Sequence, residues 1–162
     1  MKLSLFSDYS LRVLMYGALK GAPFQLDEVT DAYAISRHHL GKVVNRLARL
    51  GYLDTQRGRG GGIRLSLDPA SIRIGQLLRK TEDQPVFVEC FDPKTNRCPV
   101  AGSCRLKGFL AEAILEFYRS LDRHSLKDLV EGSHLEAMRE ALLGRTPAPA
   151  AWEVHPGKSP SP

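Results

Sequence analysis

Residues 35–67 read ISRHHLGKVVNRLARLGYLDTQRGRGGGIRLSL, and this stretch decides the fold. Apolar residues recur every three or four positions from residue 37 to residue 50, which predicts a helix with one buried face. Ser36 is a suitable N-cap for this helix, and Gly51 is a suitable left-handed stop. The predicted buried face consists of Leu40, Val43, Val44, Leu47 and Leu50.

A hairpin is predicted to follow this helix. Residues 52–56 and 63–67 alternate partly between apolar and polar side chains, as short strands do. Between them lies RGRGGG, whose glycines can adopt the positive φ angles of a tight turn and whose arginines can lie along a nucleic-acid backbone. A glycine-rich tip without a ligand is the alternative. The run follows a helix and leads into a strand, which is the wrong context for a nucleotide-binding loop.

The preceding residues complete a helix-turn-helix pattern. A helix is predicted over residues 8–20, with Ser7 or Asp8 as its N-cap, and a shorter one over residues 27–33. A tight turn then leads to the polar, basic start of the next helix, as in DNA-binding helix-turn-helix proteins. With the hairpin, and a further helix predicted over residues 71–83, residues 1–83 form a winged helix-turn-helix domain. The predicted fold class is mainly α with a small β-hairpin wing.

The basic residues gather in the same region. The formal net charge is +5, and residues 37–64 contain seven Lys or Arg against one acid, Asp54. Such a surface suits a polyanion, although a solvated basic face is the alternative. Base contacts are expected from the first turns of the recognition helix and phosphate contacts from the wing. The candidate DNA-binding residues are Ser36, Arg37, His38, His39, Lys42, Arg57, Arg59 and Arg64.

Residues 84–105 form a loop that carries all three cysteines of the chain, Cys90, Cys98 and Cys104. The residues between them are turn formers that bury little apolar surface, so another interaction must fix the loop. Three thiolates suit an iron–sulfur cluster, copper(I) or zinc. A structural zinc site or reactive thiols are the alternatives, and an odd number of cysteines cannot pair fully within one chain.

A long amphipathic helix is expected after the loop. Because a single winged-helix core has little use for a helix of this length, we interpret it as a dimerisation helix that opens a helical region over residues 106–143; intramolecular packing is the alternative. Residues 144–162 contain five prolines and are expected to be a disordered tail. The apolar face of the helix consists of Leu106, Leu110, Ala113, Ile114, Phe117 and Leu121.

The sequence also argues against several classes of protein. It contains no apolar run of membrane-spanning length and no signal-peptide pattern, so a cytoplasmic protein without a membrane partner is expected. A thiol redox enzyme or iron–sulfur carrier is a competing hypothesis, but no C-x-x-C motif supports it. No nucleophile–base constellation was found elsewhere, so the chain is predicted not to be an enzyme.

Five segments together resemble one family of winged-helix transcription regulators. This family contains the iron–sulfur cluster regulator IscR and the nitric-oxide-sensing repressor NsrR, and the three-cysteine loop followed by CRLKGFLAEAI is most similar to the NsrR branch. The resemblance covers residues 1 to about 131. The other segments are FSDYSLRVLMY, ISRHHLGKVVNRLARLGYL, RGRGGGIRLS and SIRIGQLL.

The resemblance implies a homodimer that binds a two-fold operator on double-stranded DNA. It also implies one iron–sulfur cluster per subunit, typically 4Fe–4S in the NsrR branch, on Cys90, Cys98 and Cys104; 2Fe–2S and zinc are the alternatives. Nitric oxide would attack the cluster, lower DNA affinity and derepress nitric oxide detoxification genes. The alternative is a regulator of the same fold that senses cluster supply, oxygen or redox state.

The resemblance leaves one ligand position to be filled. Lys107 stands where the IscR-like proteins have a histidine, which argues against the IscR-type ligand set. The family carries an acidic residue at the start of its first helix, and Asp8 occupies that place here. Asp8 of the partner subunit is therefore the predicted fourth ligand, and a plain N-cap role is the alternative.

Overall fold

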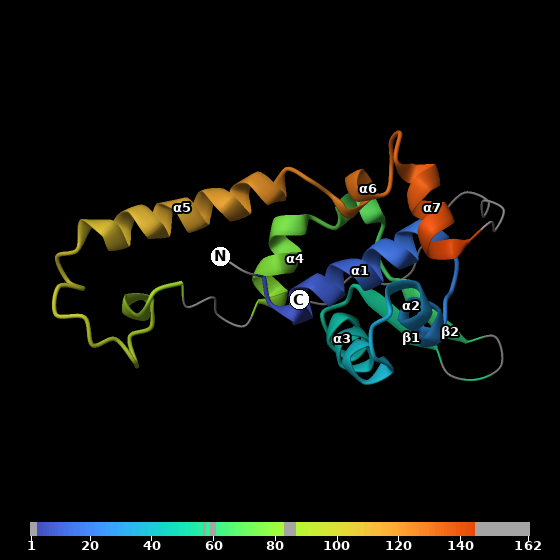
Figure 1. Cartoon of the computed structure of the whole chain (residues 1–162), viewed down its shortest axis with the longest axis horizontal. Coiled ribbons are helices and arrows are strands. Elements are labelled where there is room, and N and C mark those ends of the chain that lie inside the picture. Colours follow the sequence, from blue (N-terminus) through green and yellow to red (C-terminus); the bar gives the residue numbers. More distant parts are fainter. Residues whose placement is uncertain (1–2, 57, 59–60, 83–86, 145–162) are drawn as a thin grey trace.

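The computed structural model describes residues 3–56, 58, 61–82 and 87–144. Figure 1 shows a body of packed helices with a hairpin on one side, and a long helix that projects away from that body. The predicted class, mainly α with a small hairpin wing, is confirmed. The wing residues Arg57 and Arg59 and the predicted tail beyond residue 144 lie outside the described residues.

Helix α1 (Leu5–Lys20) runs through the centre of the body and buries Val13 and Leu14 completely. The prediction that Ser7 or Asp8 caps this helix is wrong. Ser4 is the N-cap, and its hydroxyl accepts the Ser7 backbone N–H at 3.1 Å. The earlier start is fixed by a distant residue, because Glu82 accepts hydrogen bonds from both the backbone and the hydroxyl of Ser4.

Helices α2 (Leu26–Tyr33) and α3 (Arg37–Arg49) form the predicted helix-turn-helix. The chain turns between them at Ala34, which has a left-handed φ of 53°. Helix α3 ends with Leu50 as its C-cap, and Gly51 follows at a φ of 78°. Four of the five predicted core residues of α3 are buried, and Leu50 is partly buried. The recognition helix is therefore anchored by one apolar face.

Strands β1 (Leu53–Gln56) and β2 (Gly62–Leu65) pair antiparallel. The register sets Asp54 opposite Arg64 and Leu53 opposite Leu65. Phe24, in the connection between α1 and α2, forms an isolated bridge with Ile63. The hairpin is therefore attached to the core on the face of Leu53 and Ile63, and Asp54 and Arg64 lie on the other face.

The single helix predicted over residues 71–83 is wrong in extent. A 3₁₀ turn η1 (Pro69–Ser71) is separated from α4 (Ile74–Thr81) by extended backbone. This backbone pairs with a segment some fifty residues later: Arg73 bridges to Ser125, and the Ile72 carbonyl accepts the Leu126 N–H at 2.8 Å. The long-range pairing interrupts a helix that local pattern alone would continue.

The remaining elements are the 3₁₀ turn η2 (Glu89–Phe91) and helices α5 (Arg105–Asp122), α6 (Leu126–Leu129) and α7 (Leu135–Leu143). Helix α5 forms the projecting arm, and the cysteine loop lies at its far end (Figure 1). Helix α6 begins with a capping box of Ser125 and Asp128, and α7 packs on α1 and α2. No helix in the described part of the chain is long and apolar enough to span a bilayer.

Candidate nucleic-acid interface and metal centre

The start of α3 is organised by its own N-cap. The Ser36 hydroxyl accepts the His39 backbone N–H at 3.4 Å and lies 2.9 Å from Nδ1 of the same residue. The His39 ring also lies 6.3 Å from the ring of Tyr9. Ser36 and His39 are thus both engaged in ordering the first turn, while Arg37 and His38 project from it as exposed side chains.

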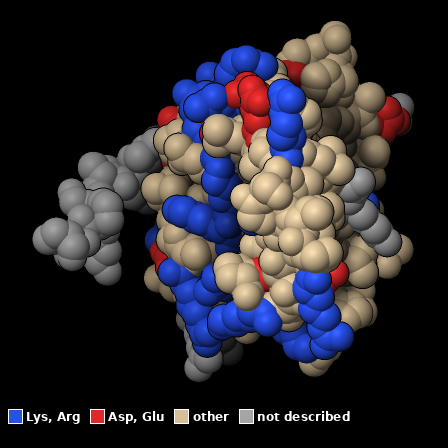
Figure 2. Space-filling view, turned by 90° about the vertical axis from the view of Figure 1, so that its left-hand side faces the viewer, with Lys and Arg blue, Asp and Glu red and all other residues tan. Residues whose placement is uncertain are grey.

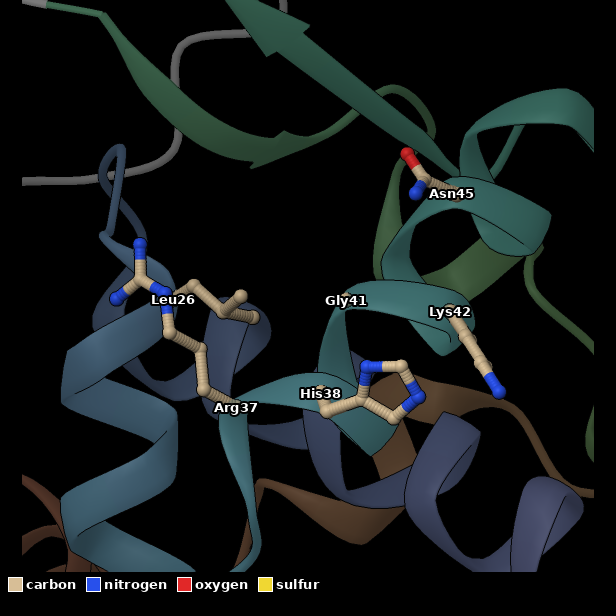
Figure 3. Close-up of a pocket in the computed structure, with 6 residues that line it drawn as sticks. All are labelled: Leu26, Arg37, His38, Gly41, Lys42 and Asn45. Atoms are coloured by element: carbon tan, nitrogen blue, oxygen red, sulfur yellow. The ribbon is translucent and has the colours of Figure 1, made fainter.

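An open hollow lies on the outer face of α3 (Figure 3). Gly41 forms part of its lining, and a Cβ atom added at that position would meet no atom within 4 Å. Arg37 extends beside Leu26 of α2, and Lys42 extends away on the other side. Asn45 is not among the predicted DNA-binding residues, although it follows Gly41 by one helical turn and so shares its face. The hollow is lined by Leu26, Arg37, His38, Gly41, Lys42 and Asn45.

Acidic side chains pair with two of the predicted DNA-binding arginines. Arg37 forms an ion pair with Asp27 in the first turn of α2. Arg64 donates through Nε and Nη2 to the Asp54 carboxylate at 3.2 and 2.9 Å. Lys42 has no carboxylate partner within ion-pair distance in the part of the chain that the structure describes. The predicted basic face therefore holds both paired and unpaired cations.

Figure 2 shows the molecule from the end at which the cysteine loop lies. Lys and Arg side chains gather at the upper left and along the lower edge of this face, and Asp and Glu are fewer. Clustered positive charge of this kind suits a phosphate backbone.

The cysteine loop is held by short-range polar contacts. Asp92 accepts the backbone N–H of Lys94 at 2.9 Å and the Thr95 hydroxyl at 2.8 Å, and these two bonds lower the pKa of its carboxyl. Glu89 accepts the Arg97 N–H at 2.7 Å, closing a longer turn. Such turns order the loop locally without burying an apolar core, as the sequence predicted.

The three cysteines lie at different points of this loop. Cys90 is in η2, Cys98 follows a turn, and Cys104 is the N-cap residue of α5; all three are free thiols and partly exposed. Their donor chemistry fits a soft metal or an iron–sulfur cluster. Within the described residues, no three Cys, His, Asp or Glu side chains lie close enough to hold a metal ion. Joint ligation therefore requires the loop to close around the metal.

Asp8 lies in the first turn of α1 and is half-exposed. Its Oδ2 accepts from Nε and Nη2 of Arg12, one turn later, at 3.1 and 3.0 Å. The Arg12 guanidinium also lies 5.5 Å from the centre of the Tyr33 ring in α2. Figure 1 places the start of α1 beside α4, whereas the cysteine loop lies beyond the far end of α5. Asp8 and the cysteines of one chain are therefore not brought together.

The arm is joined to the body where α5 crosses α4. The Arg79 guanidinium donates to both oxygens of Asp122 at 2.9 and 2.7 Å and lies 4.8 Å from the centre of the Tyr118 ring. The hydrogen bond from Arg79 lowers the pKa of the Asp122 carboxyl. Gly75 lets the two helices approach closely, since a Cβ there would lie 2.5 Å from the Tyr118 carbonyl oxygen.

Comparison with known proteins identifies the family. The model of the Rrf2 family, described as "Iron-dependent Transcriptional regulator", matches residues 3–132. The HTH-type transcriptional regulator NsrR of Bacillus subtilis (strain 168) is 48% identical over 133 residues, covering 81% of this chain and 91% of the relative. NsrR of Halalkalibacterium halodurans is 45% identical over 149 residues, covering 91% and 100%.

Solved structures support the same fold. CymR of B. subtilis matches with a TM-score of 0.61 at 26% identity, over 80% of this chain and 95% of that one. T. potens IscR matches with a TM-score of 0.62 at 19% identity, over 80% and 86%. The chain therefore belongs to the Rrf2 family of transcriptional regulators, and it is a DNA-binding regulator rather than an enzyme.

Proposed function

We propose that this protein is a cytoplasmic, homodimeric repressor that binds a two-fold operator and senses nitric oxide through an iron–sulfur cluster. It would control genes for nitric oxide detoxification. One observation carries the proposal: three free thiols lie on a loop at one end of helix α5, and the other end of that helix is fastened to the DNA-binding domain. Relatives named as HTH-type transcriptional regulator NsrR support the regulator function, and the resemblance to the NsrR branch implies the nitric oxide response.

The exposed apolar surface of α5 supports a dimer. None of its 18 residues is buried, and Leu106 and Phe109 are 60% and 57% exposed. A helix of this length spans about 27 Å. Apolar side chains along such a length are costly to leave in water, so a second copy of the helix is the natural cover. The predicted interface face begins at Leu106, and Leu121 at its other end packs against the core of its own chain.

Cys90, Cys98 and Cys104 would hold the cluster, with Asp8 of the partner subunit as the fourth ligand. When bound, a 4Fe–4S cluster would supply the iron with which nitric oxide reacts. One cluster per subunit is proposed, and 2Fe–2S and zinc are the alternatives. Asp8 must exchange its bond to Arg12 for the metal, which the exposure of this ion pair allows.

The contacts around Asp8 suggest how ligation would reach the DNA-binding surface. Ser7 of the same helical turn shares a buried hydrogen bond with Thr81 at the end of α4, at 2.9 Å. Arg12, the ion-pair partner of Asp8, also lies over the ring of Tyr33, directly before the turn into α3, so ligation of Asp8 would change the contacts of this guanidinium. Ligation by Asp8 would therefore alter a helix that packs directly on the recognition helix.

The proposal is tested by the absorption spectrum of protein purified without oxygen, with iron, sulfide and zinc assays before and after stepwise addition of nitric oxide. A coloured protein that nitric oxide bleaches supports the proposal. Cys98→Ser should lose the colour, and Ser103→Ala, a neighbouring loop variant without a proposed ligand role, should retain it. Bleaching by oxygen and not by nitric oxide would support the alternative sensor, and one zinc per colourless chain would contradict both.

A further inference from the structure

The candidate DNA surface carries two kinds of cation. Arg37 and Arg64 are paired with Asp27 and Asp54, respectively. Three other cations on α3 have no carboxylate within ion-pair distance in the described part of the chain. The unpaired side chains are Lys42, Arg46 and Arg49.

The Arg37–Asp27 pair lies at the start of α3, and the Arg64–Asp54 pair lies on the hairpin. Both pairs belong to the candidate DNA surface. Asp27 and Arg37 are each 63% exposed, and Asp54 lies directly across the hairpin from Arg64. Ion pairs this exposed contribute little to folding. Asp54 is also the only acid between residues 37 and 64. The main effect of the two carboxylates is therefore to neutralise the positive charge of the paired arginines and to restrict the orientation of their guanidinium groups.

DNA must compete with these carboxylates for the guanidinium groups. Contacts to phosphate raise affinity for any sequence, because each neutralised phosphate releases counterions. A contact to guanine instead requires a guanidinium whose two donors are aimed at the base edge. Arg37 is the first residue of the recognition helix, where such base contacts are made. Asp27 contacts this guanidinium through Nη1, which restricts its orientation, leaves Nε and Nη2 as the pair of donors for a base edge, and weakens its attraction to phosphate.

We propose that Asp27 is a positioning residue for operator recognition: it orients Arg37 toward a base edge and lowers the affinity of the surface for DNA of arbitrary sequence. The proposal rests on DNA binding through α3, as in the proposed function, and extends it to sequence discrimination.

The experiment uses the full-length protein, prepared without oxygen so that all variants have the same metal content. The operator probe is a duplex that the wild type selects from a random pool, and the second probe is its scrambled counterpart. Asp27→Asn should lower the Kd for the scrambled duplex about threefold to tenfold, with less or no gain on the operator. The ratio of the two Kd values should therefore fall.

The chain offers a matched control in Asp31→Asn. Asp31 lies one turn after Asp27 on α2, is exposed and has no ion pair among the described residues. The Asp31→Asn substitution removes the same charge without freeing an arginine. It should therefore change the Kd for the operator and the Kd for the scrambled duplex by similar factors, each smaller than the effect of Asp27→Asn on the scrambled duplex. Asp27→Glu, which keeps the carboxylate, should retain discrimination.

A double-mutant cycle separates positioning from general charge. If Asp27 acts through Arg37, Asp27→Asn should have no further effect on the Kd ratio in an Arg37→Ala background. An equal effect with and without Arg37, or equal effects of Asp27→Asn and Asp31→Asn, would overturn the inference. A wild type that enriches no sequence and binds neither duplex would instead overturn the DNA-binding function on which it rests.

Discussion

Arg79 in α4 and Asp122 at the end of α5 form a bidentate ion pair, with N–O distances of 2.9 and 2.7 Å. The pair fastens the arm to the DNA-binding domain at one end, while Cys104 lies at the other end of the same helix. Gly75 brings the two helices into close contact beside it. In the proposed function, this junction is where a change at the cysteine loop would be passed to the DNA-binding domain.

The Arg79–Asp122 pair should give stability a specific dependence on pH. The hydrogen bond from Arg79 lowers the pKa of the Asp122 carboxyl in the folded protein. The pair therefore stabilises the fold fully above the pKa that Asp122 has in the unfolded chain, and this stabilisation is lost as pH falls through the pKa of the folded protein. Wild type should exceed Asp122→Asn by at most about 1 kcal/mol in free energy of unfolding at neutral pH. Denaturant titrations should show this difference shrinking below about pH 4. A difference that persists undiminished in stronger acid would contradict the assignment.

Gly75→Ala should loosen the junction. Its Cβ would lie 2.3 Å from Oδ1 of Asp122 and 2.5 Å from the Tyr118 carbonyl oxygen, so helix backbone must shift. We expect a loss of about 1–3 kcal/mol in free energy of unfolding. Gly41→Ala is the control: its Cβ meets nothing within 4 Å, so it should stabilise the helix by about 0.5–1 kcal/mol. Losses of equal size in both variants would contradict the close approach of α4 and α5.

Glu28 should be the most sensitive polar residue between α1 and α2. Its carboxylate accepts the Gln25 N–H at 2.8 Å and the Tyr16 hydroxyl at 3.0 Å, and it pairs with Lys20. Glu28→Ala removes all three and should cost about 1–2 kcal/mol. Glu28→Gln keeps a capping acceptor and should cost less. Chemical unfolding of the two variants checks this order, and the reverse order would contradict it.

The two sides of α5 should differ in their effect on dimerisation. Leu106 and Leu115 are nine residues apart, so they point in opposite directions from the helix axis. Both are exposed, at 60% and 46%, so a charge at either position should be tolerated by the monomer. Leu106→Glu should shift the protein toward monomer in sedimentation experiments, and Leu115→Glu should not. Equal effects would show that the predicted face is not the interface.

Local pattern was sufficient to predict the DNA-binding domain. Helix α3 was predicted within one residue at its C-terminal end, because its period and its cap are encoded in adjacent residues. The break before α4 was missed because it depends on Ser125, far along the chain. The N-cap of α1 was misassigned for the same reason: the Ser4–Glu82 bond decides the start, and nearby sequence gives no sign of it.

The candidate sites also divide into features that residue type predicts and features that depend on distant parts of the chain. The sequence identified the thiols and the basic helix, since residue type alone gives their chemistry. It could not give the partner of Arg64, although Asp54 was noted as an isolated acid; that pairing needs the hairpin register. Asn45 could have been included from helical periodicity alone. The gathering of the three cysteines around a metal stays a prediction, because their thiols do not converge in the described part of the chain.

Whether nitric oxide controls DNA binding through the cluster is best measured as operator affinity during an anaerobic nitric oxide titration of cluster-loaded protein. Fluorescence anisotropy of a labelled operator duplex and visible absorbance would be recorded on the same sample. DNA affinity should fall in step with loss of the cluster absorbance, and a Cys98→Ser protein should show neither change. Operator affinity that stays constant while the cluster is destroyed would contradict this prediction.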